Sequence, residues 1–438
     1  MKNRKTKNSD IITRRHFLKS ATGVTAGAIA FPYIVSSSAL GKDSSVAPSN
    51  RIVMACIGVG GMGTGNMNSF LGKKEAQVVA VCDIDKSHRE KARDNVDKKY
   101  GNNDCKMYSD FREVIGRKDI DALSLAMPDH WHSIPVVMAA RAGKDMYGEK
   151  PLARTIHEGQ VMVETVHRYG RVWQTGSWQR SVSDFHRACE LARNGRIGKV
   201  HKVEVGLPTG SGTDNKPIQP VPEGVDWDFW LGPAPWVPFR GVMHWDWRWI
   251  MDYSGGQLTD WAGHHIDIAH WGLGLDYTGP VEIEGKGVYP SDGIFDVPTE
   301  YKFTCKYADG LTMVVANDRQ QPMGMGTVWY GEDGWIHVKR GKLEASSESI
   351  LKEVIGPDEI RLERSRDHHQ NFLDCVKSRE KTITPIEIAH RSISVALLGE
   401  IAMLTERKLR WDPEKEIFLN DDEANRMLSR PMRSPWHL

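Results

Sequence analysis

The chain has 438 residues, with 58 Lys and Arg against 57 Asp and Glu, and a formal net charge of +1. This length allows two or three domains, and the 40% share of hydrophobic residues is enough for well-buried cores. Residues 1–20 hold seven of the basic residues and one acid, which leaves 51 basic against 56 acidic residues from position 21 onward. A body with this balance offers no basic face, so we expect no nucleic-acid partner. The six cysteines are scattered without a C-x-x-C, so we expect neither a disulfide framework nor a structural zinc site.

Residues 1–49 have the pattern of a targeting segment and linker rather than of a folded domain. A basic stretch contains the twin arginine Arg14-Arg15, and a modest Gly/Ala-rich apolar run follows over residues 21–35. That run is too short and too weakly apolar for a stable membrane span, and Ser37-Ser38-Ala39 offers small residues for cleavage. The segment resembles a twin-arginine export signal, which predicts a periplasmic or exported protein. The alternative interpretation is a basic, disordered tail.

A dinucleotide-binding pattern follows at once. Residues 51–57 predict a short buried strand that runs into a G-x-G-x-x-G, after which a helix is expected. Gly58 permits a tight turn, Gly60 leaves room for a pyrophosphate, and Gly63 lets the helix pack close to the sheet. The helix N-terminus then offers unpaired N–H groups to the phosphates. The residues expected to bind the phosphates are Gly58, Gly60, Gly61, Met62 and Gly63.

The choice of cofactor rests on Asp83. It ends a second apolar strand, over residues 77–82, and falls 20 residues after Gly63. A carboxylate at this place binds the ribose hydroxyls of NAD and would repel the 2′-phosphate of NADP. NAD is therefore the expected cofactor and NADP the less favoured one.

Strands and helices keep alternating as far as residue 176, which predicts a doubly wound parallel sheet over residues 50–176. Two strand-to-helix loops, at 127–132 and 148–151, should lie at the carboxyl edge of this sheet, where ligands bind in such folds. We therefore expect them to complete the cofactor site through Pro128, His130, His132, Glu149 and Lys150.

A second domain is expected over residues 177–438. A Trp/Pro/Gly-rich passage covers 208–249, and the segments 281–289, 300–306 and 312–316 read as antiparallel strands, with Asp309-Gly310 as a hairpin turn. Closing helices are expected between about 367 and 406. This pattern predicts an α+β domain built on a sheet.

Glu149-Lys150-Pro151 after such a nucleotide-binding unit, together with the stretch G-G-Q-L-T-D-W-A-G-H-H-I-D at 255–267, resembles the glucose–fructose oxidoreductase/inositol dehydrogenase (Gfo/Idh/MocA) family. The resemblance covers nearly all of residues 51–438. It implies an N-terminal Rossmann domain and a C-terminal α+β domain with a large open, mostly antiparallel sheet. It also implies oxidation of a secondary alcohol on a sugar or cyclitol through NAD(P), with Lys150, Asp260 and His264 as the catalytic residues. Members of the family often form dimers or tetramers.

The residues support this chemistry on their own terms. Asp260 and His264 are four residues apart, and Asp267 lies three beyond, so all three share one side of a helix. His264 suits the general base of an alcohol oxidation, Asp260 would orient its ring, and Lys150 would hold the alkoxide by charge. Asp267 would bind a neighbouring hydroxyl.

Two other interpretations of this stretch stay open. Asp260 would also suit a helix N-cap, and His264, His265 and Asp267 could be read as metal ligands. We expect no metal site, because adjacent histidines point to different faces. The family often has glycine two residues after the first Asp, but this chain has Ala262 there and Gly263 next, which leaves the local backbone open.

Ten of the 15 tryptophans fall between Trp173 and Trp271, clustered with Gln, Arg and His. Flat aromatic rings beside polar groups suit a sugar, although large core side chains in an irregular loop would give the same pattern. Arg180 and Arg248, with His186 as a weaker choice, are the expected substrate-binding residues outside the motif.

Export would restrict the reaction. Free NAD is scarce outside the cytoplasm, so a tightly held cofactor would have to be re-oxidised in place. The main prediction is an exported oxidoreductase that acts on a sugar, glycoside or cyclitol. The first alternative is a glycosidase that oxidises its substrate transiently, eliminates and returns the hydride, with His265, Asp129 or His132 as a further acid/base. The second is a non-catalytic sugar- or nucleotide-binding protein.

Overall fold

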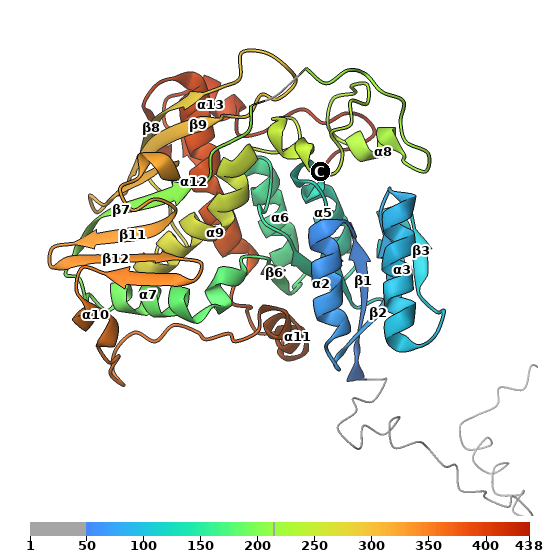
Figure 1. The fold of residues 1–438 in the computed structure, drawn as a ribbon, viewed down its shortest axis with the longest axis horizontal. Helices are drawn as coiled ribbons and strands as arrows, with labels where there is room; N and C mark the ends of the chain where they lie inside the picture. The colour runs from blue at the N-terminus through green and yellow to red at the C-terminus, as the bar shows by residue number, and fades with distance from the viewer. Residues whose placement is uncertain (1–49, 213–214) are drawn as a thin grey trace, which may run out of the picture. The chain divides into compact units, whose positions relative to one another are not determined.

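The computed structural model describes residues 50–212 and 215–438 of the chain (Figure 1). The predicted export signal and linker, residues 1–49, lie outside the described residues, as do residues 213–214. Two sheets organise the described part.

The N-terminal sheet has six parallel strands in the order β3-β2-β1-β4-β5-β6, the order of a dinucleotide-binding Rossmann fold. Five α-helices and a short 3-10 helix alternate with these strands, as the sequence predicts. The strands are β1 (Ile52–Ile57), β2 (Ala76–Cys82), β3 (Lys106–Tyr108), β4 (Ala122–Leu125), β5 (Asp145–Gly148) and β6 (Trp173–Thr175). The helices are α2 (Gly61–Leu71), α3 (Lys86–Tyr100), α4 (Phe111–Ile115), the 3-10 helix η2 (Asp129–Trp131), α5 (Ser133–Arg141) and α6 (Ile156–Arg168).

Local chemistry explains where these elements begin. The strand β1 is buried at every position except Val53, as a central strand covered on both faces must be. Asp85 caps α3 by accepting a hydrogen bond from the Ser87 N–H, and Thr155 caps α6 in the same way.

The C-terminal sheet has nine strands in the order β13-β12-β11-β7-β10-β9-β8-β14-β15. Only the β7–β10 pair is parallel among the described pairs, so the expected mostly antiparallel sheet is confirmed. The strands are β7 (Val200–Leu207), β8 (Glu282–Val288), β9 (Glu300–Lys306), β10 (Thr312–Asn317), β11 (Gly326–Gly331), β12 (Gly334–Lys339), β13 (Lys342–Ala345), β14 (Leu409–Asp412) and β15 (Ile417–Phe418).

The helices of this region pack on the nine-stranded sheet but leave one of its faces open. They are η3 (Trp178–Ser181), α7 (Ser183–Arg193), α8 (Trp227–Leu231), η4 (Asp246–Trp249), α9 (Gly256–Leu273), η5 (Asp318–Gln320), α10 (Glu348–Lys352), α11 (His368–Ser378), α12 (Ile386–Thr405) and α13 (Asp422–Arg426). Of these, α7, α9 and α12 pack against the sheet (Figure 1). Along β9, Tyr301, Phe303 and Cys305 are buried while the residues between them are partly or fully exposed, so the sheet keeps an open face.

The Trp/Pro/Gly-rich passage folds back over the nucleotide-binding domain. The Lys86 N–H donates to the Gly224 carbonyl, and the Trp131 indole donates to the Trp230 carbonyl. Trp227 and Trp230 stack in parallel, with ring centroids 4.7 Å apart, inside a separate hydrophobic cluster. Much of this passage is therefore a small core of its own that is anchored to the first domain.

One helix in the described residues, α12, is long and apolar enough by composition to cross a membrane, but 83% of that stretch is buried within the fold.

Candidate active site

The site is a cavity of about 560 Å³ at the carboxyl edge of the six-stranded sheet. Its walls come from the glycine loop after β1, from the loops after β2, β4 and β5, from residues 243–248, and from the start of α9. This is the edge where ligands of open α/β sheets bind.

The glycine loop leaves the space that a pyrophosphate needs. Gly58 has φ +75°, and a Cβ there would lie 2.4 Å from the Ala126 carbonyl oxygen, so only glycine makes this turn. A Cβ at Gly63 would lie 1.8 Å from the Gly58 oxygen, which explains the close approach of α2. At Gly60 the nearest atom to a Cβ would be a ring atom of His88 at 3.5 Å, and at Gly61 nothing lies within 4 Å. The open backbone at the start of α2 fits a dinucleotide, and Met62 lines the same wall.

Asp83 lines the cavity beside this loop. Its Oδ2 accepts the Val59 N–H at 2.9 Å, and its Oδ1 accepts the Asp85 N–H at 3.0 Å. The bond with Asp83, opposed by partial burial, raises the pKa of the neighbouring His88. The carboxylate thus stands where ribose hydroxyls would be bound.

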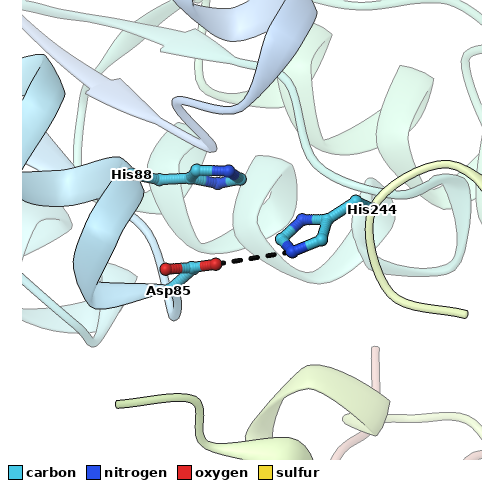
Figure 2. Close-up of side chains that lie close together, drawn as sticks. All are labelled: Asp85, His88 and His244. Atoms are coloured by element: carbon cyan, nitrogen blue, oxygen red, sulfur yellow. Dashed lines mark ion pairs between the residues drawn. The ribbon is translucent and has the colours of Figure 1, made fainter. Parts of the chain in front are cut away.

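A cluster formed by Asp85, His88 and His244 closes the same end of the cavity (Figure 2). His244 reaches from its loop toward Asp85, with its Nε2 3.5 Å from Asp85 Oδ2. The two imidazole rings lie 4.9 Å apart. Asp85, His88 and His244 each offer one possible ligand atom, and these atoms lie within 4.8 Å of one another. The three side chains could therefore also hold a cation. Their position beside Asp83 makes them a wall of the expected ribose site.

Lys150 and Asp260 meet at the opposite end. Lys150 Nζ donates to Asp260 Oδ1 at 2.7 Å, and Arg248 Nε lies 3.9 Å from the same oxygen. Burial alone would raise the pKa of the Asp260 carboxyl, but the Lys150 and Arg248 cations outweigh it and leave the pKa below its usual value. A Cβ at Gly263 would lie 3.0 Å from Lys150 Cβ, so the glycine that follows Ala262 is the point where Lys150 packs on α9.

Asp260 is not the N-cap of this helix, because α9 begins at Gly256. Nor does it orient His264. Its partner is Lys150, and no Asp260–His264 hydrogen bond is present within the part of the chain that the structure describes.

His264 lines the cavity one helical turn beyond Asp260. Burial, reinforced by the Lys150 and Arg340 cations, holds the pKa of its imidazole well below the ordinary value. Its Nδ1 is buried and has no hydrogen-bond partner among the described residues. This environment favours the neutral imidazole, in which one of the two ring nitrogens can accept a proton.

Two of the histidines expected in the cofactor site do not line the cavity. His130 Nε2 donates to the Trp230 carbonyl at 3.0 Å, and burial lowers the pKa of His130 to about 3. His132 lies between the carbonyls of Pro151 and Met127, 2.7 and 2.8 Å away. Both histidines join loops to one another, so the expectation that they contact the cofactor is corrected. Both are buried behind the cavity wall.

Pro128, Asp129 and Glu149 do line the cavity. Glu149 accepts a hydrogen bond from Asn66 at 2.9 Å, and burial raises the pKa of its carboxyl. Asp129 accepts one from Ser254 at 2.6 Å, and burial raises its pKa as well.

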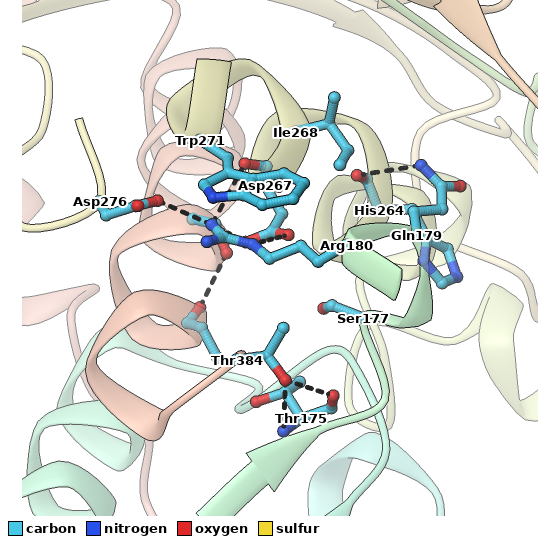
Figure 3. Close-up of polar contacts among 12 residues, drawn as sticks. Thr175, Ser177, Gln179, Arg180, His264, Asp267, Ile268, Trp271, Asp276 and Thr384 are labelled. Carbon is cyan, nitrogen blue, oxygen red and sulfur yellow. Dashed lines mark hydrogen bonds and ion pairs between the residues drawn. The ribbon is translucent and has the colours of Figure 1, made fainter. Parts of the chain in front are cut away.

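The expectation that Arg180 and Asp267 bind substrate is also corrected. They pair with each other through two bonds of 2.8 Å, and each is only 1% exposed (Figure 3). Arg180 also donates to Asp276 at 2.7 Å and lies over the Trp271 ring. A buried guanidinium needs such partners, so this group joins the turn after β6 to α9 instead of facing the cavity. His186 lies outside the cavity too, 3.1 Å from the Leu362 carbonyl.

Sequence reasoning missed Arg340. It occupies the two-residue turn between β12 and β13 and lines the cavity between Trp178 and Trp261. The predicted Arg248 is in the cavity as expected, stacked between Trp245 and Trp247. An arginine beside a glycine in an apparent loop carries no motif, so the sequence offered no signal for Arg340.

Comparison with known proteins supports the nucleotide-binding assignment. Residues 52–177 match the family model described as "Oxidoreductase family, NAD-binding Rossmann fold", and residues 190–438 match "Oxidoreductase family, C-terminal alpha/beta domain". The predicted NAD-binding Rossmann fold and the predicted α/β class of the C-terminal part are thereby confirmed.

Among curated relatives, the α-N-acetylgalactosaminidase of Shewanella oneidensis is 30% identical over 175 residues, which is 36% of this chain and 37% of that protein. The uncharacterized oxidoreductase YrbE of Bacillus subtilis is 24% identical over 278 residues, 63% of this chain and 69% of that one. The chain thus spans little more than a third of the length of the α-N-acetylgalactosaminidase. Among solved structures, the aldose-aldose oxidoreductase of Caulobacter crescentus, complexed with glycerol, shares the fold with a TM-score of 0.60 at 18% identity, over 82% of this chain and 99% of that one.

Proposed function

This chain belongs to the Gfo/Idh/MocA oxidoreductase family, and from that premise we propose that it oxidises a secondary hydroxyl of a sugar, glycoside or cyclitol by hydride transfer to NAD. The observation that carries the proposal is the meeting of Lys150, Asp260 and a neutral His264 in one cavity with an open glycine loop. An alcohol oxidation removes a proton from the hydroxyl and a hydride from the carbon that bears it. It therefore needs a base beside the hydroxyl and a hydride acceptor beside the carbon.

Each side chain has a distinct part. The neutral imidazole of His264 accepts the proton of the hydroxyl. The Lys150 ammonium stabilises the developing alkoxide, and Asp260, 2.7 Å away, holds the ammonium in place. NAD, when bound, supplies the hydride acceptor. The glycine loop and Asp83 would hold it.

We further propose that the protein is exported and retains its cofactor. The twin-arginine pattern at Arg14-Arg15 supports export. The anchored passage supports retention, because His244 of that passage contacts Asp85 across the expected ribose site. A retained cofactor would cycle in place, reduced by one substrate and oxidised by a second. We also propose a dimer or tetramer that pairs through the open face of the nine-stranded sheet.

The second candidate is an NAD-dependent glycosidase that works by transient oxidation. The similarity to the Shewanella α-N-acetylgalactosaminidase favours it. Such an enzyme needs a further acid/base at the leaving group. Of the three residues expected for that part, Asp129 lines the cavity, whereas His132 and His265 do not.

The test is to purify the folded protein without added cofactor, denature it, and identify the nucleotide released. Near-stoichiometric NAD(H) is the expected result. Paired sugars and chromogenic glycosides, given to the loaded protein, then separate the two reactions. Reduction of the bound NAD by sugars supports the oxidoreductase, and release of a chromophore without net reduction supports the glycosidase. An empty protein that reduces no added NAD with any sugar would overturn both, and would indicate a binding protein.

A further inference from the structure

Three basic side chains gather at the end of the cavity where Lys150 and Asp260 meet. Lys150, Arg248 and Arg340 all line it, and the carboxylate among them is Asp260. Lys150 Nζ forms an ion pair with Asp260 Oδ1 at 2.7 Å, and Arg248 Nε lies 3.9 Å from that same oxygen. The Asp260 carboxylate thus forms ion pairs with two of the three cations, Lys150 and Arg248.

The other carboxyl groups of this wall have hydrogen-bond partners other than Arg340. Asp129 and Glu149 are both buried, and each accepts a hydrogen bond within the protein, from Ser254 and from Asn66. Neither makes an ion pair with Arg340. Across residues 50–212 and 215–438, no carboxylate lies within salt-bridge distance of the Arg340 guanidinium.

Arg340 is nevertheless held in place. Its guanidinium carbon lies 4.5 Å from the ring centroid of Trp178 and 4.5 Å from that of Trp261. Its Nε donates to Gln179 Oε1 at 3.1 Å, and the Gln179 amide donates in turn to the His264 carbonyl at 3.3 Å. Figure 3 shows Gln179 and His264 side by side at this junction.

The contacts with Trp178, Trp261 and Gln179 determine which atoms of the Arg340 guanidinium can bind a ligand. Two indole rings lie over its carbon, and Gln179 occupies its Nε. The terminal Nη1/Nη2 pair remains, and this fork matches the oxygens of a carboxylate or sulfate two at a time. Because the stacking already fixes the side chain, little conformational freedom is lost when an anion binds.

We propose that the substrate carries an anionic substituent, a carboxylate or a sulfate ester, and that Arg340 binds it. This inference rests on the proposed sugar oxidation. The fixed distance between Arg340 and His264 on either side of Gln179 would then select which hydroxyl faces the base. Neutral sugars would bind the same cavity without this contact, and correspondingly more weakly.

Calorimetric titration of the NAD-loaded protein tests the idea with glucose, glucuronate and glucose 6-sulfate, followed by the galactose and mannose series. We expect at least one acidic sugar to bind tenfold or more tightly than its neutral counterpart, with an affinity that falls as salt is added. Whichever acid binds more tightly identifies the substituent. Equal affinity for neutral and acidic members of every series would overturn the inference.

Substitutions test whether Arg340 is the residue responsible for the preference for acidic sugars. In Arg340→Gln the ratio of acid affinity to neutral-sugar affinity should fall to about one, and Arg340→Lys should restore part of the preference, because the charge returns without the fork. Lys339→Gln removes the neighbouring cation, which does not line the cavity, and should change nothing. A preference that survives in Arg340→Gln would overturn the assignment.

The two proposals fail in different ways. Bound NAD that neutral sugars reduce, without any advantage for acids, leaves the proposed oxidation standing and removes only this inference. Bound NAD that no sugar reduces removes the oxidation, whatever the sugars' affinities.

Discussion

At the scale of single residues, the proposed chemistry depends on a histidine that stays neutral. His264 is buried near two cations, Lys150 and Arg340, which together with its desolvation disfavour the imidazolium form. A general base must be unprotonated to act. The surroundings therefore keep this base ready over a wide range of pH at the cost of some basicity.

The pH dependence follows from the direction of this shift. Because the pKa of His264 lies well below its ordinary value of about 6.5, the base should remain unprotonated as the pH falls through 6.5. The profile of kcat/KM for the free enzyme should therefore stay level there and decline only at lower pH. An acidic limb centred at or above pH 6.5 would contradict the neutral-base assignment.

Removal of the base gives the direct test. In His264→Ala we expect turnover to fall about 10²- to 10⁴-fold, the usual contribution of a positioned general base. The cofactor content of the purified protein should not change, since the glycine loop and Asp83 are untouched. His186→Ala, which alters a histidine outside the cavity, is the control and should retain full turnover.

At the scale of elements, α9 organises the substrate half. It carries Asp260 and His264 toward the cavity and Asp267 toward the buried Arg180. Ser177 donates to the Gly263 carbonyl at 2.6 Å and so ties the turn after β6 to the same helix. The helix is thus anchored on one side, and it presents the proposed catalytic residues to the cavity on the other.

Gly263→Ala should separate stability from activity. Alanine favours a helix interior by up to about 1 kcal/mol over glycine, so the resistance of the protein to unfolding should hold or rise. The added Cβ, 3.0 Å from Lys150 Cβ, must displace that side chain, and a small displacement of a positioning group can cost about 10²-fold in rate. Thermal melting and steady-state kinetics together check both halves. A variant with unchanged turnover would show that the position of Lys150 is not critical.

Arg180→Met should act on stability first. It leaves Asp267 buried without its cation, and breaking such a pair typically costs about 3–5 kcal/mol. Chemical denaturation should show a clear drop in the unfolding midpoint. The double variant R180M/D267L, which removes both charges, should recover part of the loss. If the single variant were as stable as the parent, the ion pair would not hold α9.

At the scale of the whole described region, the passage that includes His244 joins the second half of the chain to the first. Its contacts with α3 and with Trp131 cross the ribose end of the cavity. If the cofactor is retained as proposed, its release should depend on movement of this passage.

His244→Ala should speed that release. The variant loses the contact with Asp85, so we expect NADH to leave the protein several-fold faster in a chase with excess NAD, while the fold is kept. His201→Ala, an exposed histidine on β7, is the matched control. Identical release rates in the parent and in His244→Ala would argue against a role for this contact in retention.

The sequence predicted what depends on local pattern. The turn at Gly58, the close packing at Gly63 and the strand-loop order of the first domain follow from glycine sterics and hydrophobic runs. The spacing of Asp260 and His264 likewise placed both on the cavity side of one helix. What depended on distant partners was not predictable. Asp267 has helical spacing suited to the site, but the buried Arg180 decides its direction, as 87 residues separate the two in the chain.

Arg340 makes the same point in reverse. Its turn joins the short strands β12 and β13, and pairing across the sheet brings the turn back to α9. No local pattern marks a residue whose role is set by a non-local contact with Trp178 and Trp261.

The tryptophans around the cavity also have an optical consequence. Trp178, Trp245, Trp247 and Trp261 all line the space that a dinucleotide would share. Reduced nicotinamide absorbs light at the wavelengths where indole emits, whereas the oxidised ring does not. The protein's own fluorescence should therefore dim when the cofactor is reduced and brighten when it is oxidised. The indoles that shape the site would thus report each half of the redox cycle in real time, without any label.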